Sequence, residues 1–150
     1  MIPRVEATID LNAIQHNFGV IKSLVPATTQ IMPMVKANDY GHGLIDVARH
    51  LEQADAFGVA TLVEAFRLRN AGIKQDIFVM CGFRSSDEIP VFVELGLTAV
   101  VHHLDQVQWL QQHRLERPLA LWLKIDTGMH RLGIDPTNFE KTYATLLQLP

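Results

Sequence analysis

The sequence contains little that marks a secreted, membrane-spanning or nucleic-acid-binding protein. Cys81 is the single cysteine among 150 residues, so no disulfide can form within the chain. No stretch approaches about 18 consecutive apolar residues, and the opening Met1–Glu6 lacks the apolar core of a secretory signal. The formal net charge of −3 provides no basic footprint for nucleic acid or an anionic membrane. These absences predict a cytoplasmic protein with a buried, reduced thiol, and neither nucleic acid nor membrane as a partner.

Short apolar runs alternate with stretches of helical periodicity along the whole chain. The apolar runs predict five buried strands, at residues 31–36, 56–60, 77–81, 97–102 and 119–125. The periodic stretches predict helices at residues 11–24, 44–53, 61–72, 86–95, 104–113 and 137–149. This alternation predicts an α/β fold in which helices cover a parallel sheet.

Two architectures fit such a sheet. An open, doubly wound sheet would be complete with five strands, but no G-x-G-x-x-G motif follows any of them. A (β/α)8 barrel needs eight βα units and about 250 residues, so five strands would be part of one. The last residues, 146–150, resemble the end of a helix, and the chain is therefore expected to be the N-terminal portion of a longer protein.

The run at residues 31–36 ends in Lys36, and a polar turn with Tyr40 and His42 follows it. A lysine where a buried strand meets a loop is partly desolvated, which lowers its pKa and leaves a nucleophilic amine near neutral pH. Such amines form Schiff bases with carbonyl compounds, including pyridoxal 5'-phosphate (PLP). The alternative is a solvated lysine at the end of a strand, and the pattern alone leaves both open.

Four segments together resemble the alanine racemases. They are Glu6–Asn17, Val35–Gly43, Phe57–Ala65 and Lys124–Gly133, and they follow one another in the family's order. The resemblance implies that residues 1–150 are the N-terminal part of a PLP-binding (β/α)8 TIM-type barrel domain. The rest of the barrel and a C-terminal β domain would lie outside this chain. Asp39 departs from the pattern, because the family usually has alanine there, and it adds a charge beside the cofactor loop.

The same resemblance implies roles for four residues. Lys36 would hold PLP as a Schiff base and act as one of two acid/base groups on the substrate Cα. Tyr40 would donate a hydrogen bond to the cofactor phosphate. Arg131 would lie beside the cofactor's phenolic oxygen and favour the substrate carboxylate. The lysine equivalent to Lys124 is N-carbamylated (N6-carboxylysine) in many family members, which makes it an anion that pairs with the arginine.

The implied activity is the interconversion of L-alanine and D-alanine by a PLP-dependent homodimer that supplies D-alanine for peptidoglycan. The 150 residues alone are expected to be inactive, because the family's second acid/base group comes from the partner subunit. The alternative is another barrel-type PLP protein, either a racemase of broader amino-acid range or a PLP-homeostasis binding protein.

Two other classes of site are weighed against this one. Asp126-Thr-Gly128 is also the aspartic-protease triplet, but that chemistry needs two carboxylates on a β-rich scaffold. A metal site is not expected, because His102 and His103 are adjacent and would point to opposite faces of a strand, and the chain has no cysteine cluster.

Overall fold

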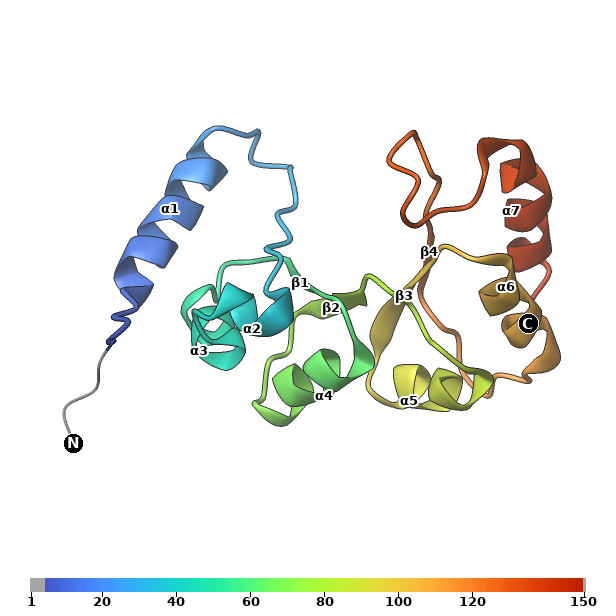
Figure 1. The fold of residues 1–150 in the computed structure, drawn as a ribbon, viewed down its shortest axis with the longest axis horizontal. Helices are drawn as coiled ribbons and strands as arrows, with labels where there is room; N and C mark the ends of the chain where they lie inside the picture. Colours follow the sequence, from blue (N-terminus) through green and yellow to red (C-terminus); the bar gives the residue numbers. More distant parts are fainter. Residues whose placement is uncertain (1–4, 150) are drawn as a thin grey trace.

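The computed structural model describes residues 5–149 and contains a four-stranded parallel sheet (Figure 1). The strands follow chain order: β1 (Ala56–Val59), β2 (Asp76–Val79), β3 (Leu97–Val101) and β4 (Leu121–Leu123). Each strand pairs in parallel with the next one along the chain. The predicted α/β fold with a parallel sheet is confirmed.

Helices connect the strands and flank the sheet at both ends. They are α1 (Leu11–Ser23), α2 (Lys36–Tyr40), α3 (Leu44–His50), α4 (Leu62–Asn70), α5 (Ile89–Glu94), α6 (Leu104–Gln112) and α7 (Phe139–Leu147), with short 3₁₀ turns η1 (Ser86–Glu88) and η2 (Pro136–Asn138). Helix α1 contacts α3 at one end of the molecule, and α7 contacts α6 at the other (Figure 1). Among the described residues, no helix has the length and apolar character needed to cross a bilayer.

Local side-chain contacts explain where several of these helices begin. Thr61 and Glu64 form a capping box at the start of α4. His103 and Gln106 form a second capping box at the start of α6, which the sequence pattern did not reveal. Pro90 lies in the first turn of α5, where its missing N–H would have no helical partner in any case.

The predicted first strand is the main difference between expectation and structure. Residues 31–35 run beside β1, but only Met34 forms a bridge, a parallel one with Gly58. The N–H of Val35 donates to the carbonyl of Gly58, and the N–H of Gly58 donates to the carbonyl of Pro33, both at 2.9 Å. Pro33 has no N–H with which to extend the ladder. Four of the five predicted strands are therefore formed, and the one predicted at residues 31–36 is reduced to a single bridge.

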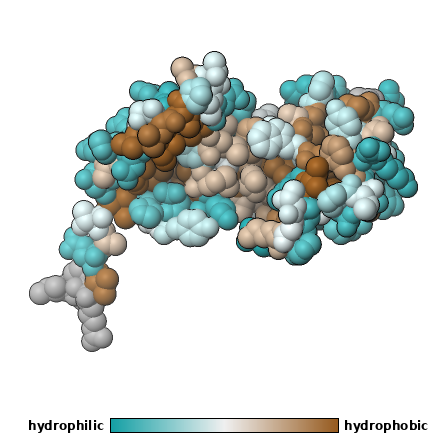
Figure 2. All heavy atoms as spheres, turned by 90° about the horizontal axis from the view of Figure 1, so that it is seen from above, coloured by the Kyte–Doolittle hydropathy of each residue, from teal (hydrophilic) through white to brown (hydrophobic). Residues whose placement is uncertain are grey.

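The two faces of the sheet differ in how well they are covered. Alternate strand residues point towards the helices and are fully buried, among them Phe57, Val59, Ile77, Val79 and Ala99. On the opposite face, the rings of Phe78 and Trp122 contact each other with centroids 4.4 Å apart. Trp122 remains 53% exposed. At the N-terminal end of the molecule, apolar side chains also gather over α1 (Figure 2).

Candidate functional site

The polar segments that follow the strands meet at one edge of the sheet. Lys36 follows the bridge at Met34, and Lys124 follows β4. The segments after β1, β2 and β3 lie between these two lysines, because the strands are parallel and in chain order. The carboxyl edge of such a sheet is where α/β proteins place their functional groups.

Lys36 is half-buried at the start of α2, directly after the buried Val35. Its Nζ lies 5.8 Å from the centroid of the Tyr40 ring, a distance typical of a cation–π contact. Tyr40 itself is 71% exposed, so its hydroxyl is accessible. Among residues 5–149, no carboxylate forms an ion pair with Lys36. The amine is therefore positioned beside an aromatic ring without being neutralised.

The turn after Lys36 has an unusual backbone. Ala37, Asn38, Asp39 and Tyr40 have φ angles of 54°, 56°, 51° and 50°, so four consecutive non-glycine residues are left-handed. Each L-residue in this conformation costs roughly 1–2 kcal/mol. The sequence pattern predicted a loop here but not its handedness. The hydrogen bonds of the turn must offset this strain.

Most of the contacts that shape the turn are internal to it. The carbonyl of Asn38 accepts hydrogen bonds from the N–H groups of Gly41 and Gly43, and its Oδ1 accepts one from Leu44 at 3.1 Å. One contact comes from elsewhere: the N–H of Ala37 donates to Oε1 of Glu64 at 2.6 Å. The S/T-x-x-E pattern of Thr61 and Glu64 predicts only a helix cap, so the sequence did not predict the contact of Glu64 with the Lys36 turn.

Asp39, the departure from the family pattern, lies in this turn with its side chain 19% exposed. Burial raises the pKa of its carboxyl, and the nearby His42 partly opposes that rise. The His42 Nδ1 lies 3.8 Å from Asp39 Oδ2. Asp39 also lines a groove beneath α1, together with Phe18 and Val47. Desolvation thus disfavours the ionised form of Asp39, and the side chain borders that groove.

At the other end of the sheet, Lys124 is half-buried and fixed by its backbone. Its N–H donates to the carbonyl of Val101, and its carbonyl accepts from the N–H of Ile134, both at 2.8 Å. Arg131 lies on the exposed loop that leads from Lys124 back to Ile134. Lys124 therefore lies at the base of this loop, and Arg131 lies on its exposed part.

Asp126 organises that loop. Its Oδ1 accepts hydrogen bonds from the N–H groups of Gly128 and His130, both at 3.0 Å, and its Oδ2 lies 3.0 Å from His130 Nδ1. The two backbone N–H groups are the main reason that the pKa of Asp126 is lowered to about 2. This carboxylate serves as a loop acceptor and not as half of a protease dyad.

Gly133 closes the same loop through a close backbone approach. Its φ is +140°, and a Cβ at this position would lie 2.3 Å from the backbone nitrogen of Asp126. Only glycine fits both the conformation and the space. The residue thus explains why the loop can return to pair Ile134 with Ile125.

The structure brings the predicted site residues to the same edge of the sheet, but in two separate groups. Lys36 and Lys124 are separated by four inter-strand spacings, which is about 19 Å measured along the sheet. Lys36 and Tyr40 share one turn, whereas Lys124 and Arg131 share one loop. Their chemical roles stay predictions, because the two groups can act on one ligand only if the sheet curves or closes and brings its two ends together.

An open cleft of about 430 Å³ lies at this edge of the sheet, and its lining includes none of Lys36, Tyr40, Lys124 and Arg131. Residues that follow each of the four strands contribute to its lining, including Thr61, Cys81, His102 and Leu132. Cys81 is half-buried and not buried as expected, because β2 ends at Val79 and the cysteine lies beyond it. Leu132 follows Arg131 directly, so the loop that carries the arginine forms one wall of the cleft.

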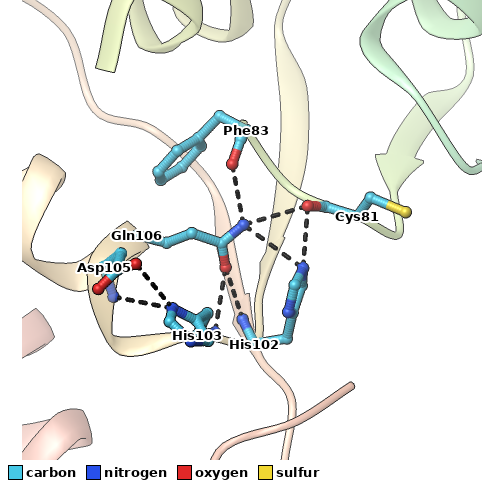
Figure 3. Close-up of polar contacts among 6 residues, drawn as sticks. All are labelled: Cys81, Phe83, His102, His103, Asp105 and Gln106. Carbon is cyan, nitrogen blue, oxygen red and sulfur yellow. Dashed lines mark hydrogen bonds and ion pairs between the residues drawn. The ribbon is translucent and has the colours of Figure 1, made fainter. Parts of the chain in front are cut away.

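The polar groups at the base of the cleft bind one another (Figure 3). The Gln106 amide donates to the carbonyls of Cys81 and Phe83 at 3.1 and 3.0 Å, and its oxygen accepts from the N–H of His102 at 2.8 Å. His102 Nε2 lies 3.0 Å from the Cys81 carbonyl, whereas His103 caps α6. This network ties the segments after β2 and β3 together. In the part of the chain that the structure describes, no three His, Cys, Asp or Glu residues cluster as metal ligands would.

Comparison with known proteins points to one family. The model for the family "Alanine racemase, N-terminal domain" matches residues 9–150. The alanine racemase of Shewanella putrefaciens is 43% identical over 150 residues, which is 100% of this chain and 42% of that protein. The alanine racemase of Vibrio atlanticus is 45% identical over 142 residues, which is 95% of this chain and 39% of that protein.

Solved structures agree with this result. The biosynthetic alanine racemase of Pseudomonas aeruginosa matches with a TM-score of 0.88 and 37% identity, over 93% of this chain and 39% of that one. The enzyme of Acinetobacter baumannii matches with a TM-score of 0.85 and 39% identity, over 93% of this chain and 42% of that one. The chain spans less than half the length of these relatives. With a family model that covers nearly all of it, the chain belongs to the alanine racemase family.

Proposed function

We propose that this chain forms the lysine-bearing part of the active site of a PLP-dependent alanine racemase. The observation that carries the proposal is the Lys36 amine, which lies at the carboxyl edge of the sheet beside the Tyr40 ring and has no acidic partner among the described residues. A strained left-handed turn fixes the backbone around it. Strain of this kind concentrates at functional sites.

The residues present fit the cofactor. An unpaired lysine amine can bond to the PLP aldehyde, and the exposed Tyr40 hydroxyl can donate a hydrogen bond to its phosphate. The cleft of about 430 Å³ is lined by Thr61 after β1 and by Leu132 beside Arg131, though not by Lys36 or Arg131 themselves, and its volume falls within the range of about 300–1,000 Å³ that is usual for small-molecule sites.

PLP, when bound, withdraws electrons from the substrate Cα and so makes its proton removable. The chain's own residues would do the rest of the work on one side of the substrate. Lys36 would take the proton from Cα or return it, as one of two acid/base groups. Arg131 would favour the substrate carboxylate, because a planar guanidinium binds a carboxylate through two parallel hydrogen bonds.

Lys124 fits the role of a modified lysine that pairs with Arg131. Lys124 is half-buried at the base of the loop that carries the exposed Arg131, and among residues 5–149 no carboxylate forms an ion pair with Lys124. Addition of CO₂ to the neutral amine forms an N–C bond and releases a proton, which leaves a carbamate anion. This anion could then pair with the Arg131 guanidinium, which an ammonium would repel.

The complete enzyme is proposed to be a cytoplasmic homodimer that supplies D-alanine for peptidoglycan. Residues 1–150 would form the first part of its barrel domain, and the second acid/base group would come from the partner subunit. The chain alone should therefore have no useful racemase activity, because inversion at Cα needs proton delivery on both faces.

A racemisation assay tests this proposal. The full-length protein should interconvert L-alanine and D-alanine, depend on added PLP after the cofactor is stripped, and lose activity in Lys36→Ala. Lys74→Ala serves as the control, since Lys74 is exposed and lies away from the carboxyl edge. Binding of PLP without turnover of any amino acid would identify a PLP-binding protein and contradict the racemase assignment.

A further inference from the structure

We propose that Glu64 is a positioning residue for Lys36, an inference that rests on the proposed function. The Glu64 carboxylate binds two separate segments with its two oxygens. Oε2 accepts from the N–H groups of Ala60 and Thr61 at 2.9 and 3.0 Å. Oε1 accepts from the N–H of Ala37 at 2.6 Å.

A helix cap accounts for only half of this arrangement. The capping box at α4 requires one glutamate oxygen, which reaches back to the residues just before the helix. The other oxygen spans 27 positions of sequence to the residue that follows Lys36. The short distance is characteristic of a hydrogen bond to a charged acceptor.

Lys36 consequently lies between two anchors, one residue to either side. Before it, the N–H of Val35 donates to the carbonyl of Gly58 in β1 at 2.9 Å. After it, the N–H of Ala37 donates to Glu64 at the start of α4. Both anchors belong to the same β1–α4 unit, so together they fix the direction in which the Lys36 side chain leaves the backbone.

The remaining contacts of the turn cannot do this. Asn38 and Asp39 hydrogen-bond to groups between residues 35 and 44, which sets the shape of the turn but not its orientation on the sheet. Among the side-chain hydrogen bonds of residues 5–149, the contact from Ala37 to Glu64 is the one that joins this turn to α4. Without this hydrogen bond, the left-handed turn would be less well fixed to the sheet, and the Lys36 side chain would point in other directions for part of the time.

Two substitutions remove the simultaneous contact of residue 64 with both segments. In Glu64→Gln one oxygen becomes an NH₂ group, which must face a backbone N–H donor whichever way the amide is turned. In Glu64→Asp the charge at the helix N-terminus stays, but the shorter side chain cannot span both segments. The matched control is Asp10→Ala, which removes the side-chain cap of α1 and leaves the Lys36 turn intact.

The experiment is a PLP titration of the full-length apoenzyme, followed by absorbance of the lysine–PLP linkage, together with kcat and KM for alanine. If a misdirected Lys36 is competent about one-tenth of the time, the apparent Kd for PLP rises about tenfold. The same misplacement should lower kcat by about 10- to 100-fold and change KM by less than about twofold. Asp10→Ala should titrate like the wild type.

The outcomes distinguish this inference from the proposed function. Wild-type-like PLP titration and kcat in Glu64→Gln and Glu64→Asp would overturn the positioning role while leaving Lys36 as the PLP lysine. Failure of the wild-type protein to bond PLP through Lys36 would overturn the proposed function, and the positioning role with it. If Glu64→Gln does not fold, Glu64→Asp decides alone, since it keeps the charge at the start of α4.

Discussion

The two segments that carry the proposed site residues Lys36 and Arg131 are held in opposite ways. The turn after Lys36 depends on an outside group, since Glu64 of α4 binds it next to the lysine. The loop from Lys124 to Gly133 is held by its own Asp126, which accepts two backbone N–H groups from within the loop. The first arrangement couples the lysine to the sheet, whereas the second shapes a loop that leaves Arg131 exposed.

The carboxylates of the two segments show the same contrast in their acidity. Burial raises the pKa of Asp39 in the Lys36 turn. Backbone N–H groups lower the pKa of Asp126 to about 2 in the other loop. An aspartate that is desolvated without backbone donors destabilises its surroundings when charged, and one that accepts such donors stabilises them. The effect of an aspartate on stability therefore depends on the hydrogen-bond donors that face it, which its position in the sequence does not reveal.

Gly133→Ala should have the largest effect, because it breaks the self-held loop. The new Cβ would lie 2.3 Å from the Asp126 nitrogen, in a conformation that L-residues rarely adopt. We expect a loss of about 2–5 kcal/mol in the free energy of unfolding by denaturant titration. Gly96→Ala is the matched control, because its φ is also positive but no atom lies within 4 Å of the added Cβ. Equal losses in the two variants would show that the close approach is unimportant.

Arg131→Lys tests the role of the guanidinium and leaves the hydrogen bonds of Asp126 within the loop unchanged. A point charge replaces a planar fork that can bind a carboxylate bidentately. In the full-length protein we expect PLP to stay bound and turnover of alanine to fall by about 10- to 100-fold. Steady-state kinetics and the PLP absorbance measure the two effects separately. Unchanged turnover would remove Arg131 from the site.

Asp126→Asn tests the self-held loop through its pH dependence. The folded pKa of about 2 lies below the ordinary value of 3.8, so between these values the unfolded chain binds more protons than the folded one. The stabilisation by Asp126 is thus complete above about pH 4 and is lost as the pH falls through about 2. The difference in unfolding free energy between wild type and Asp126→Asn should shrink over this window. A difference that is constant with pH would mean that the charge of Asp126 does not hold the loop.

Asp39→Asn should have the smallest effect and the opposite sign. Because burial raises its pKa, the folded chain binds more protons than the unfolded one just above the ordinary value. The charge of Asp39 is therefore unfavourable once the pH exceeds its folded pKa, and removing it should stabilise the protein slightly at neutral pH. The gain should vanish in acid, where both side chains are neutral. Thermal unfolding at neutral and acidic pH measures the gain, and destabilisation at neutral pH would contradict the account.

The fold was largely predictable, because the alternation of apolar runs and helical periods reflects which faces are buried. The weakness of the first strand was not predicted, although Pro33 in that run removes a ladder donor and was the signal for it. The left-handed turn at residues 37–40 was not predictable, because none of those four residues is glycine and propensity gives no reason for positive φ. The second contact of Glu64 was equally hidden, since it joins positions 27 apart and depends on the packing of α4 against the turn.

The central claim is that Lys36, and not the other lysine at this edge of the sheet, is the residue that bonds to PLP. Borohydride reduction of the PLP-loaded full-length protein, followed by peptide mapping, tests it most directly. The pyridoxyl mass should appear on the peptide that contains Lys36 and be absent from the peptide that contains Lys124. A label on Lys124, on another lysine or on no lysine would contradict this account.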